Sequence, residues 1–168
     1  MDNFPFIRDL FELLDARMER LVAEIKASED PDGFGLLDDA EDVFGIGLVA
    51  AQRYLTSVRG WHNISKNDAL NSGPIHSGGQ SFAKIINAAA NYWKHIDEWD
   101  LGAVVHRDID GLETIQSNTM RVIESVTPWA DYTLANLLHD LIGEPQLSLL
   151  LPILQQWREE LLVAQNVG

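Results

Sequence analysis

The sequence predicts an all-α protein: an up-and-down bundle of about five to six helices in one domain spanning residues 1–168. Apolar residues recur at three- and four-residue steps over long segments, as on the buried face of a helix. No segment of any length alternates apolar and polar residues as a strand does. The hydrophobic content of 46% is ordinary for a globular chain, and 168 residues suffice to bury a core.

The first helix is expected from about Pro5 to Ile25, with Asp2 or Asn3 as its cap and Pro5 in its first turn. Its apolar positions follow helical spacing and comprise Phe6, Ile7, Leu10, Leu13, Leu14, Met18, Leu21, Val22 and Ile25. Its opposite face is expected to form a solvated charged stripe of Arg8, Glu12, Asp15, Glu19 and Lys26.

A turn at residues 28–35, rich in proline and glycine, separates this helix from a second one. The second helix is expected from Asp38 or Asp39 to about Arg59. Gly45 and Gly47 weaken its first half and allow another helix to approach closely. A long irregular loop is then expected at about 60–80, as a lid, a binding loop or a disordered segment.

Four helices and one connector follow this loop. Ser81 is expected to cap a third helix, from Phe82 to about Glu98. After a connector at 100–109, a fourth helix is expected at 112–126. Thr127 and Pro128 indicate the start of a fifth helix at 129–142, closed by Gly143, and a last helix begins near Pro152.

The charge of the chain is strongly negative but unevenly distributed. The net charge of −14 argues against broad nucleic-acid binding, because phosphate contacts need clustered cations. The segment from Ala50 to Ile96 carries a net +4, so the rest carries −18. Its five cations, which either scatter over several faces or form one anion-accepting surface, are Arg53, Arg59, Lys66, Lys84 and Lys94.

Several classes of protein are disfavoured by what the chain lacks. It has no cysteine, which excludes a disulfide scaffold and thiolate metal sites and fits a reducing compartment. No basic n-region precedes an apolar core, and no run reaches the roughly 18 apolar residues that span a bilayer. The five histidines never stand four apart, so no metal site or cofactor is predicted, and a cytoplasmic location without membrane contact is expected.

The most specific local string is Asn-Tyr-Trp-Lys-His at residues 91–95 of the expected third helix. Asn91 and His95 are four residues apart and therefore share a helix face. An amide and an imidazole on one face can hydrogen-bond a ligand or serve as acid and base. The alternative interpretation is a solvated helix surface.

This string, in a bundle helix and followed by Asp-Glu-Trp, resembles the degenerate signature of HEPN-type helical domains, many of which are RNases or toxin and phage-defence proteins. The family's catalytic pattern is an arginine, a polar residue, three further residues and a histidine. Asn91 and His95 match its polar position and its histidine, whereas Ala90 occupies the position of the arginine. The missing arginine argues against catalysis unless Arg53, Arg59 or Lys94 substitutes for it in space.

Three functions are consistent with the sequence. The first is a HEPN-like protein without catalytic activity that binds an anionic ligand or partner at Asn91, Lys94 and His95, with Arg53 and Arg59 contributing. The second is an acidic interaction module, antitoxin-like, which lacks an active site and binds a protein partner. The third is an RNase of the toxin or defence type. A homodimer is expected, from the family resemblance and from the many aliphatic residues of the terminal helices.

Overall fold

A computed structural model of the chain describes residues 3–99, 114–128 and 131–166, and within them the protein is all-α, as predicted. Seven α-helices and two short 3₁₀ helices are present in these ranges, slightly more than the five to six helices expected. The expected connector at 100–109 lies outside the described residues. None of the described helices is both long enough and apolar enough to cross a membrane.

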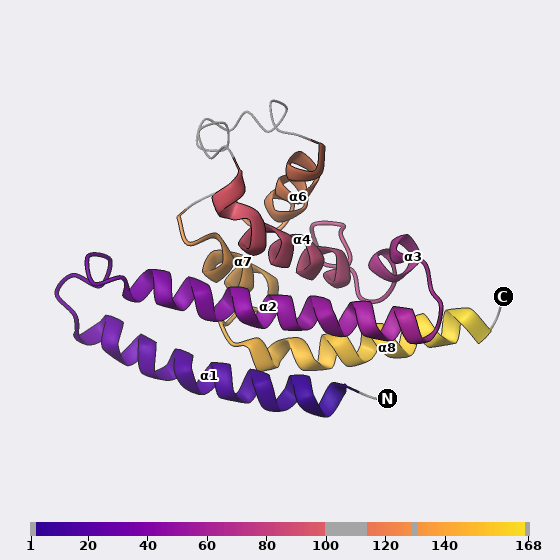
Figure 1. Cartoon of the computed structure of the whole chain (residues 1–168), viewed down its shortest axis with the longest axis horizontal. Coiled ribbons are helices and arrows are strands. Elements are labelled where there is room, and N and C mark those ends of the chain that lie inside the picture. The colour runs from indigo at the N-terminus through magenta and orange to yellow at the C-terminus, as the bar shows by residue number, and fades with distance from the viewer. Residues whose placement is uncertain (1–2, 100–113, 129–130, 167–168) are drawn as a thin grey trace.

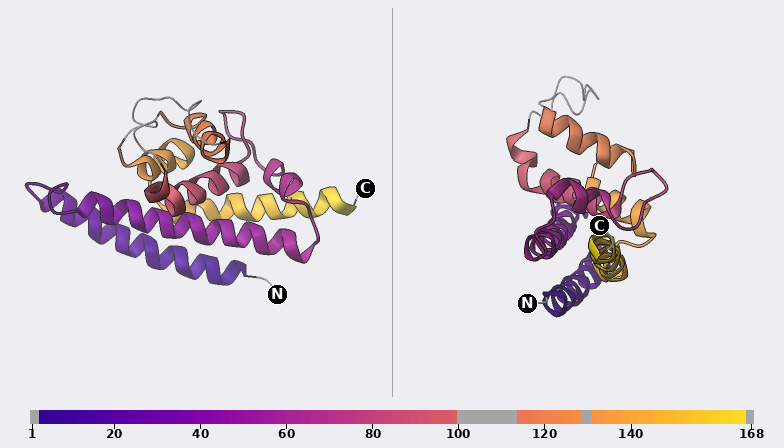
Figure 2. Two further views of the ribbon diagram at one scale, coloured as in Figure 1. Left: turned by 45° about the horizontal axis from the view of Figure 1, so that its top comes forward. Right: turned by 90° about the vertical axis from the view of Figure 1, so that its right-hand side faces the viewer.

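Three long helices run along the length of the molecule. They are α1 (Phe4–Ala27), α2 (Leu36–Trp61) and α8 (Leu151–Asn166). Helices α1 and α2 form an antiparallel hairpin, and α8 lies beside them (Figure 1). Viewed from the end of the molecule, the three helices form a compact group with the shorter helices on one side of it (Figure 2).

The shorter helices pack around a central one, α4 (Phe82–His95), which contacts α2, α3, α6 and α8. Three alanines in sequence, Ala88 to Ala90, are buried in it and let its neighbours approach closely. The remaining elements are α3 (Lys66–Asn71), α6 (Thr114–Glu124), α7 (Thr133–Ile142) and the 3₁₀ turns η1 (Ile96–Glu98) and η3 (Leu147–Leu150).

Two glycines of α2 allow the close packing that the sequence indicated. A Cβ atom at Gly45 would lie 2.2 Å from the ring of Trp93 on α4, and one at Gly47 would lie 2.4 Å from the side chain of Leu147. Both separations are far below van der Waals contact. The prediction of a close approach at these positions is confirmed.

The segment at 60–80, expected to be an irregular loop, is irregular only in part. It contains α3, whose first turn is capped by Ser65, the acceptor from the Asp68 backbone N–H at 3.1 Å. The buried indole of Trp157 donates to the carbonyl of Ala69 at 2.8 Å and so anchors α3 to α8. Helical periodicity is hard to see in six residues, which explains why the sequence did not reveal this helix.

The predicted solvated stripe of α1 is wrong at one position: Asp15 is buried, as are Phe11 and Met18 on the same helix. Its two carboxylate oxygens accept from the backbone N–H groups of Leu147 and Ser148, at 2.8 and 3.0 Å. A carboxylate on one helix therefore caps the start of another. Conversely, Phe6 and Leu13, expected in the core, are 70% and 64% exposed on α1.

The helix expected at 129–142 begins later, at Thr133, and ends as expected at Gly143, whose φ is 83°. The side chain of Glu41 on α2 accepts from the backbone N–H groups of Leu134 and Ala135, the latter at 3.0 Å. The start of α7 therefore coincides with a carboxylate from a distant helix rather than with the local Thr-Pro signal. Residues 129–130 of the expected helix lie outside the described residues.

Two glycine substitutions in the same helix are expected to have opposite effects on stability. Gly45→Ala forces a methyl group against the Trp93 ring and should lower the free energy of unfolding by about 1–3 kcal/mol. Gly60→Ala meets no atom within 4 Å and should raise it by up to about 1 kcal/mol, since alanine favours the helix. Urea unfolding of both variants measures the difference, and equal shifts of the midpoint would contradict the close α2–α4 packing.

Candidate functional site

A recess of about 300 Å³ lies where α2, α3 and α4 meet. Each of these helices contributes at least one polar or cationic side chain to it. The lining residues are Gln52, Leu55, Thr56 and Arg59 from α2, Lys66, Ala69 and Leu70 from α3, and Asn87, Asn91 and Lys94 from α4.

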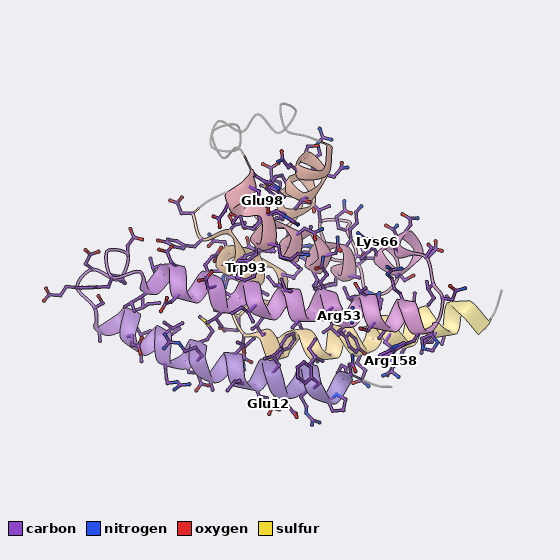
Figure 3. All side chains as sticks on the ribbon, viewed as in Figure 1. Glu12, Arg53, Lys66, Trp93, Glu98 and Arg158 are labelled. Atoms are coloured by element: carbon purple, nitrogen blue, oxygen red, sulfur yellow. The ribbon has the colours of Figure 1, made fainter. Side chains whose placement is uncertain are left out.

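Two polar rows face each other across this recess. On α2 the row is Gln52, Thr56 and Arg59, and on α4 it is Asn87, Asn91 and Lys94. Both rows have i, i+4, i+7 spacing, which places their members on one helix face. Lys66 adds a third cation from α3, at the right of the molecule in Figure 3.

Gln52 connects the two rows through both ends of its amide. Its Nε2 donates to Asn87 Oδ1 at 3.0 Å and to Asn91 Oδ1 at 2.9 Å. Its Oε1 accepts from Lys94 Nζ at 2.8 Å. This network fixes the orientation of three side chains on α4 relative to α2.

The electrostatics of the recess are one-sided. Arg59, Lys66 and Lys94 line it together, and no carboxylate is among its lining residues in the described chain. Among the described ion pairs, none involves these three cations. Partial burial, and then repulsion from Lys66, lower the pKa of Lys94 below its usual range, which is the behaviour of a cation that lacks a counter-ion.

The structure brings together only part of the predicted site. Asn91, Lys94 and Arg59 line the recess, whereas His95 and Arg53 do not. His95 Nδ1 lies within hydrogen-bond distance of Glu98 Oε2, at 3.0 Å, and Figure 3 shows Glu98 and Lys66 at opposite ends of the region around α4. Arg53 is exposed.

The separation of His95 from the recess has a physical reason. Successive helical residues are turned by roughly 100°, so the recess row of Asn87, Asn91 and Lys94 passes to one side of His95. His95 is also the last residue of α4, with φ −123° and ψ 4°, where the chain enters η1. The face shared by Asn91 and His95 in an ideal helix is therefore not preserved at the helix end.

A second pocket, of about 470 Å³, lies on the other side of Lys94 and is acidic. Trp93 borders it and donates from Nε1 to Asp42 Oδ1 at 3.2 Å. Its four carboxylate side chains are Asp38, Glu41, Asp42 and Asp97. Within the described residues, no group of three or more histidine or acidic side chains is placed to hold a metal ion.

Burial raises the pKa of Glu41 above its ordinary value of 4.5, although its bonds to Leu134 and Ala135 act in the opposite direction. Repulsion from Asp38 and Asp42 adds to the rise. Glu41 is thus a helix-capping carboxylate in a poorly solvated environment that contains other negative charges. Its role in the structure is to dock α7 onto α2.

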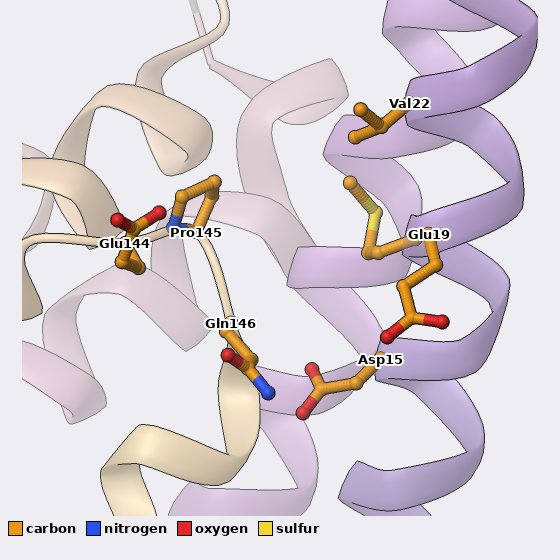
Figure 4. Close-up of a pocket in the computed structure, with 7 residues that line it drawn as sticks. Asp15, Glu19, Val22, Glu144, Pro145 and Gln146 are labelled. Carbon is orange, nitrogen blue, oxygen red and sulfur yellow. The ribbon is translucent and has the colours of Figure 1, made fainter.

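A third hollow, of about 280 Å³, lies between α1 and the segment before η3 (Figure 4). Asp15, Glu19 and Glu144 are among its lining residues. Both oxygens of Asp15 are already engaged by backbone N–H groups. This hollow is therefore explained by the junction of α1 with η3.

Comparison of the chain with protein-family models, with curated proteins and with solved structures finds no match.

Three polar side chains of the recess were not assigned to the site from the sequence. Gln52 and Thr56 belong to the polar row on α2, whose i, i+4, i+7 spacing with Arg59 was a readable signal. Lys66 was predicted as part of the cationic segment, but it lay in the expected loop. Without a predicted helix there, the direction of its side chain could not be inferred.

The raised pKa of Glu41 predicts how stability changes with pH. The folded state holds the Glu41 proton more tightly than the unfolded chain does, so stability increases as pH falls from neutral toward 4.5. Glu41→Gln removes this titration and should gain less stability than the wild type between pH 7 and pH 4.5. Urea unfolding at both pH values measures the gain, with the exposed Asp97→Asn as a charge-matched control.

An identical gain for Glu41→Gln and the wild type would show that Glu41 titrates as a solvated carboxyl group. The docking of α7 by a buried carboxylate would then be contradicted.

Proposed function

We propose that this chain is a helical binding protein that holds an anionic ligand in the recess between α2, α3 and α4, without catalysing a reaction there. One observation supports this above the others: Arg59, Lys66 and Lys94 line one recess that has no carboxylate lining it in the described chain. In a protein of net charge −14, such a local excess of cations is a focused attractive site for an anion.

The three cations come from three different helices. Folding therefore holds them close together despite their mutual repulsion. A bound anion relieves this repulsion, so the anion-bound state is more stable than the free state. The leucine and alanine side chains of the recess reduce the local dielectric constant and strengthen the attraction for an anion.

Binding, rather than acid–base catalysis, fits the lining residues best. Among the described residues, neither a histidine nor a carboxylate lines the recess, and His95 is paired with Glu98 outside it. Ala90, which occupies the arginine position of the HEPN pattern, is fully buried. We retain the HEPN-like relationship as part of the proposal on the basis of Asn91, which is the matching residue that lines the recess.

The proposal predicts that inorganic sulfate binds at pH 7.5 and that binding depends on Lys66 and Lys94. Each charge-assisted hydrogen bond is worth about 1.5–3 kcal/mol, so the double variant Lys66→Gln, Lys94→Gln should bind at least about tenfold more weakly. Isothermal titration calorimetry in chloride buffers measures the dissociation constant. The double variant Lys26→Gln, Lys84→Gln, which removes two charges outside the recess, is the matched control.

If sulfate binds both double variants equally weakly, its affinity depends only on the overall charge of the protein. That result, or no saturable binding to the wild type, would refute an anion site in the recess.

A second function, an acidic interaction module that dimerises, is favoured by a specific observation. Phe6 and Leu13 lie seven residues apart on α1, which places them on one helix face, and both are largely exposed. We propose that a homodimer covers this face and that the protein is cytoplasmic.

Sedimentation tests the proposed homodimer. Leu13→Glu should convert a dimer into a monomer, and a monomeric wild type at micromolar concentration would refute the dimer. Fractionation of cells tests the cytoplasmic location.

An RNase of the toxin or defence type is the third candidate. The polar and cationic recess is the feature that supports it, while the net charge of −14 opposes a polyanionic substrate. Cleavage of RNA by the wild type that is lost in the Lys66→Gln, Lys94→Gln variant would establish it in place of simple binding.

A further inference from the structure

The hydrogen bonds of Gln52 determine which groups the recess offers to a ligand. Its Nε2 engages the oxygen of both Asn87 and Asn91, so each asparagine presents its NH₂ group away from that contact. Its own oxygen is taken by Lys94. In the described part of the chain, no acceptor is bonded to Asn87 Nδ2 or Asn91 Nδ2.

The groups left for a ligand are therefore almost all donors. They are the two asparagine amides, the ammonium groups of Lys66 and Lys94, and the guanidinium of Arg59, which uses Nη1 to donate to the Ile64 carbonyl at 3.4 Å. Lysine and arginine have no acceptor at all. The acceptors that remain are the exposed hydroxyl of Thr56 and the second lone pairs of the three amide oxygens, each of which already accepts one hydrogen bond.

A set of donors of this size suits a particular kind of anion. A carboxylate has two oxygens, whereas a phosphate or sulfate monoester presents three terminal oxygens, each a strong acceptor. Three cations from three helices also match a group that carries close to two negative charges. A protonated phosphate would add an O–H donor to a site already full of donors, and a donor left without a partner weakens binding.

We infer that the recess binds a fully deprotonated tetrahedral oxyanion, the dianionic terminal group of a phosphate monoester, and discriminates against its protonated form through the asparagine amides that Gln52 orients. This inference rests on the proposed function, since it names the class of anion that the same recess takes. It also assigns Gln52 as a positioning residue, which acts through Asn87 and Asn91.

Two probes that differ in protonation test the inference. Inorganic sulfate stays dianionic between pH 5.5 and pH 7.5, whereas methyl phosphate loses its second proton near pH 6. The affinity for methyl phosphate relative to sulfate should therefore rise roughly fourfold from pH 5.5 to pH 7.5, following the dianion fraction. Taking the ratio cancels any titration of the protein, including that of Lys94. Calorimetry in chloride buffers at constant ionic strength gives both constants.

The variant Gln52→Met tests the role of the amide orientation. Without Gln52, the side chains of Asn87 and Asn91 can rotate and offer their oxygens to a phosphate O–H. The variant should bind sulfate several-fold more weakly and should lose most of the pH dependence of the ratio. Gln155→Met, at an exposed position on α8, should retain the wild-type ratio at both pH values. A variant with only a structural defect would bind both probes more weakly and would keep the wild-type pH dependence of their affinity ratio.

The carrier of the oxyanion is distinguished by a third probe. An end-capped phosphoserine peptide that binds as tightly as methyl phosphate at pH 7.5 indicates that the recess reads the group of a small free ester. A peptide that binds at least tenfold more tightly indicates a phosphorylated protein partner that carries the same group.

Two negative results have different meanings. If neither sulfate nor methyl phosphate binds the wild type, the proposed anion site itself is wrong. If both bind and their affinity ratio is the same at pH 5.5 and pH 7.5, the anion site stands, and the selection of the deprotonated form is overturned.

Discussion

The close contact between α2 and α4 is the constraint on which the rest of this structure depends. At one end of the contact, the absence of a side chain at Gly45 admits the ring of Trp93. Further along, the amide of Gln52 bridges to Asn87, Asn91 and Lys94. The apolar part of the interface holds the helices together, and the polar part holds the donors of the recess in place. A wider separation would leave both the core and the recess unformed.

Carboxylates of the α1–α2 hairpin organise the second half of the chain. Asp15 caps the start of η3, and Glu41 caps the start of α7, each by accepting two backbone N–H groups. Such capping satisfies backbone donors that a helix start leaves without partners. It also explains why the existence of α7 was predictable while its start was not. The apolar periodicity of α1, α2 and α4 is local and readable in the sequence, whereas the caps at Leu134 and Leu147 come from residues 93 and 132 positions away.

The candidate site shows the same division between local and distant information. Asn91, Lys94 and Arg59 were predicted because they stand in a polar string or in the cationic segment, and they line the recess. His95 follows the same spacing rule as Asn91 but lies where α4 ends, so the rule of a shared face fails for it. Lys66 could not be assigned because α3 owes its position to the tertiary bond between Trp157 and Ala69. A polar row at i, i+4, i+7 on each of two apolar helices was the signal that would have identified Gln52 in advance.

The measurement that tests this account most directly is a titration of the ¹⁵N-labelled protein with sulfate, followed through the side-chain amide resonances. If the recess binds the anion, the Nδ2 signals of Asn87 and Asn91 shift together and saturate, because these groups donate to it, while the exposed amide of Asn136 on α7 is unaffected. Unchanged Asn87 and Asn91 signals at saturating sulfate, or shifts confined to the region of His95 and Glu98, would contradict it.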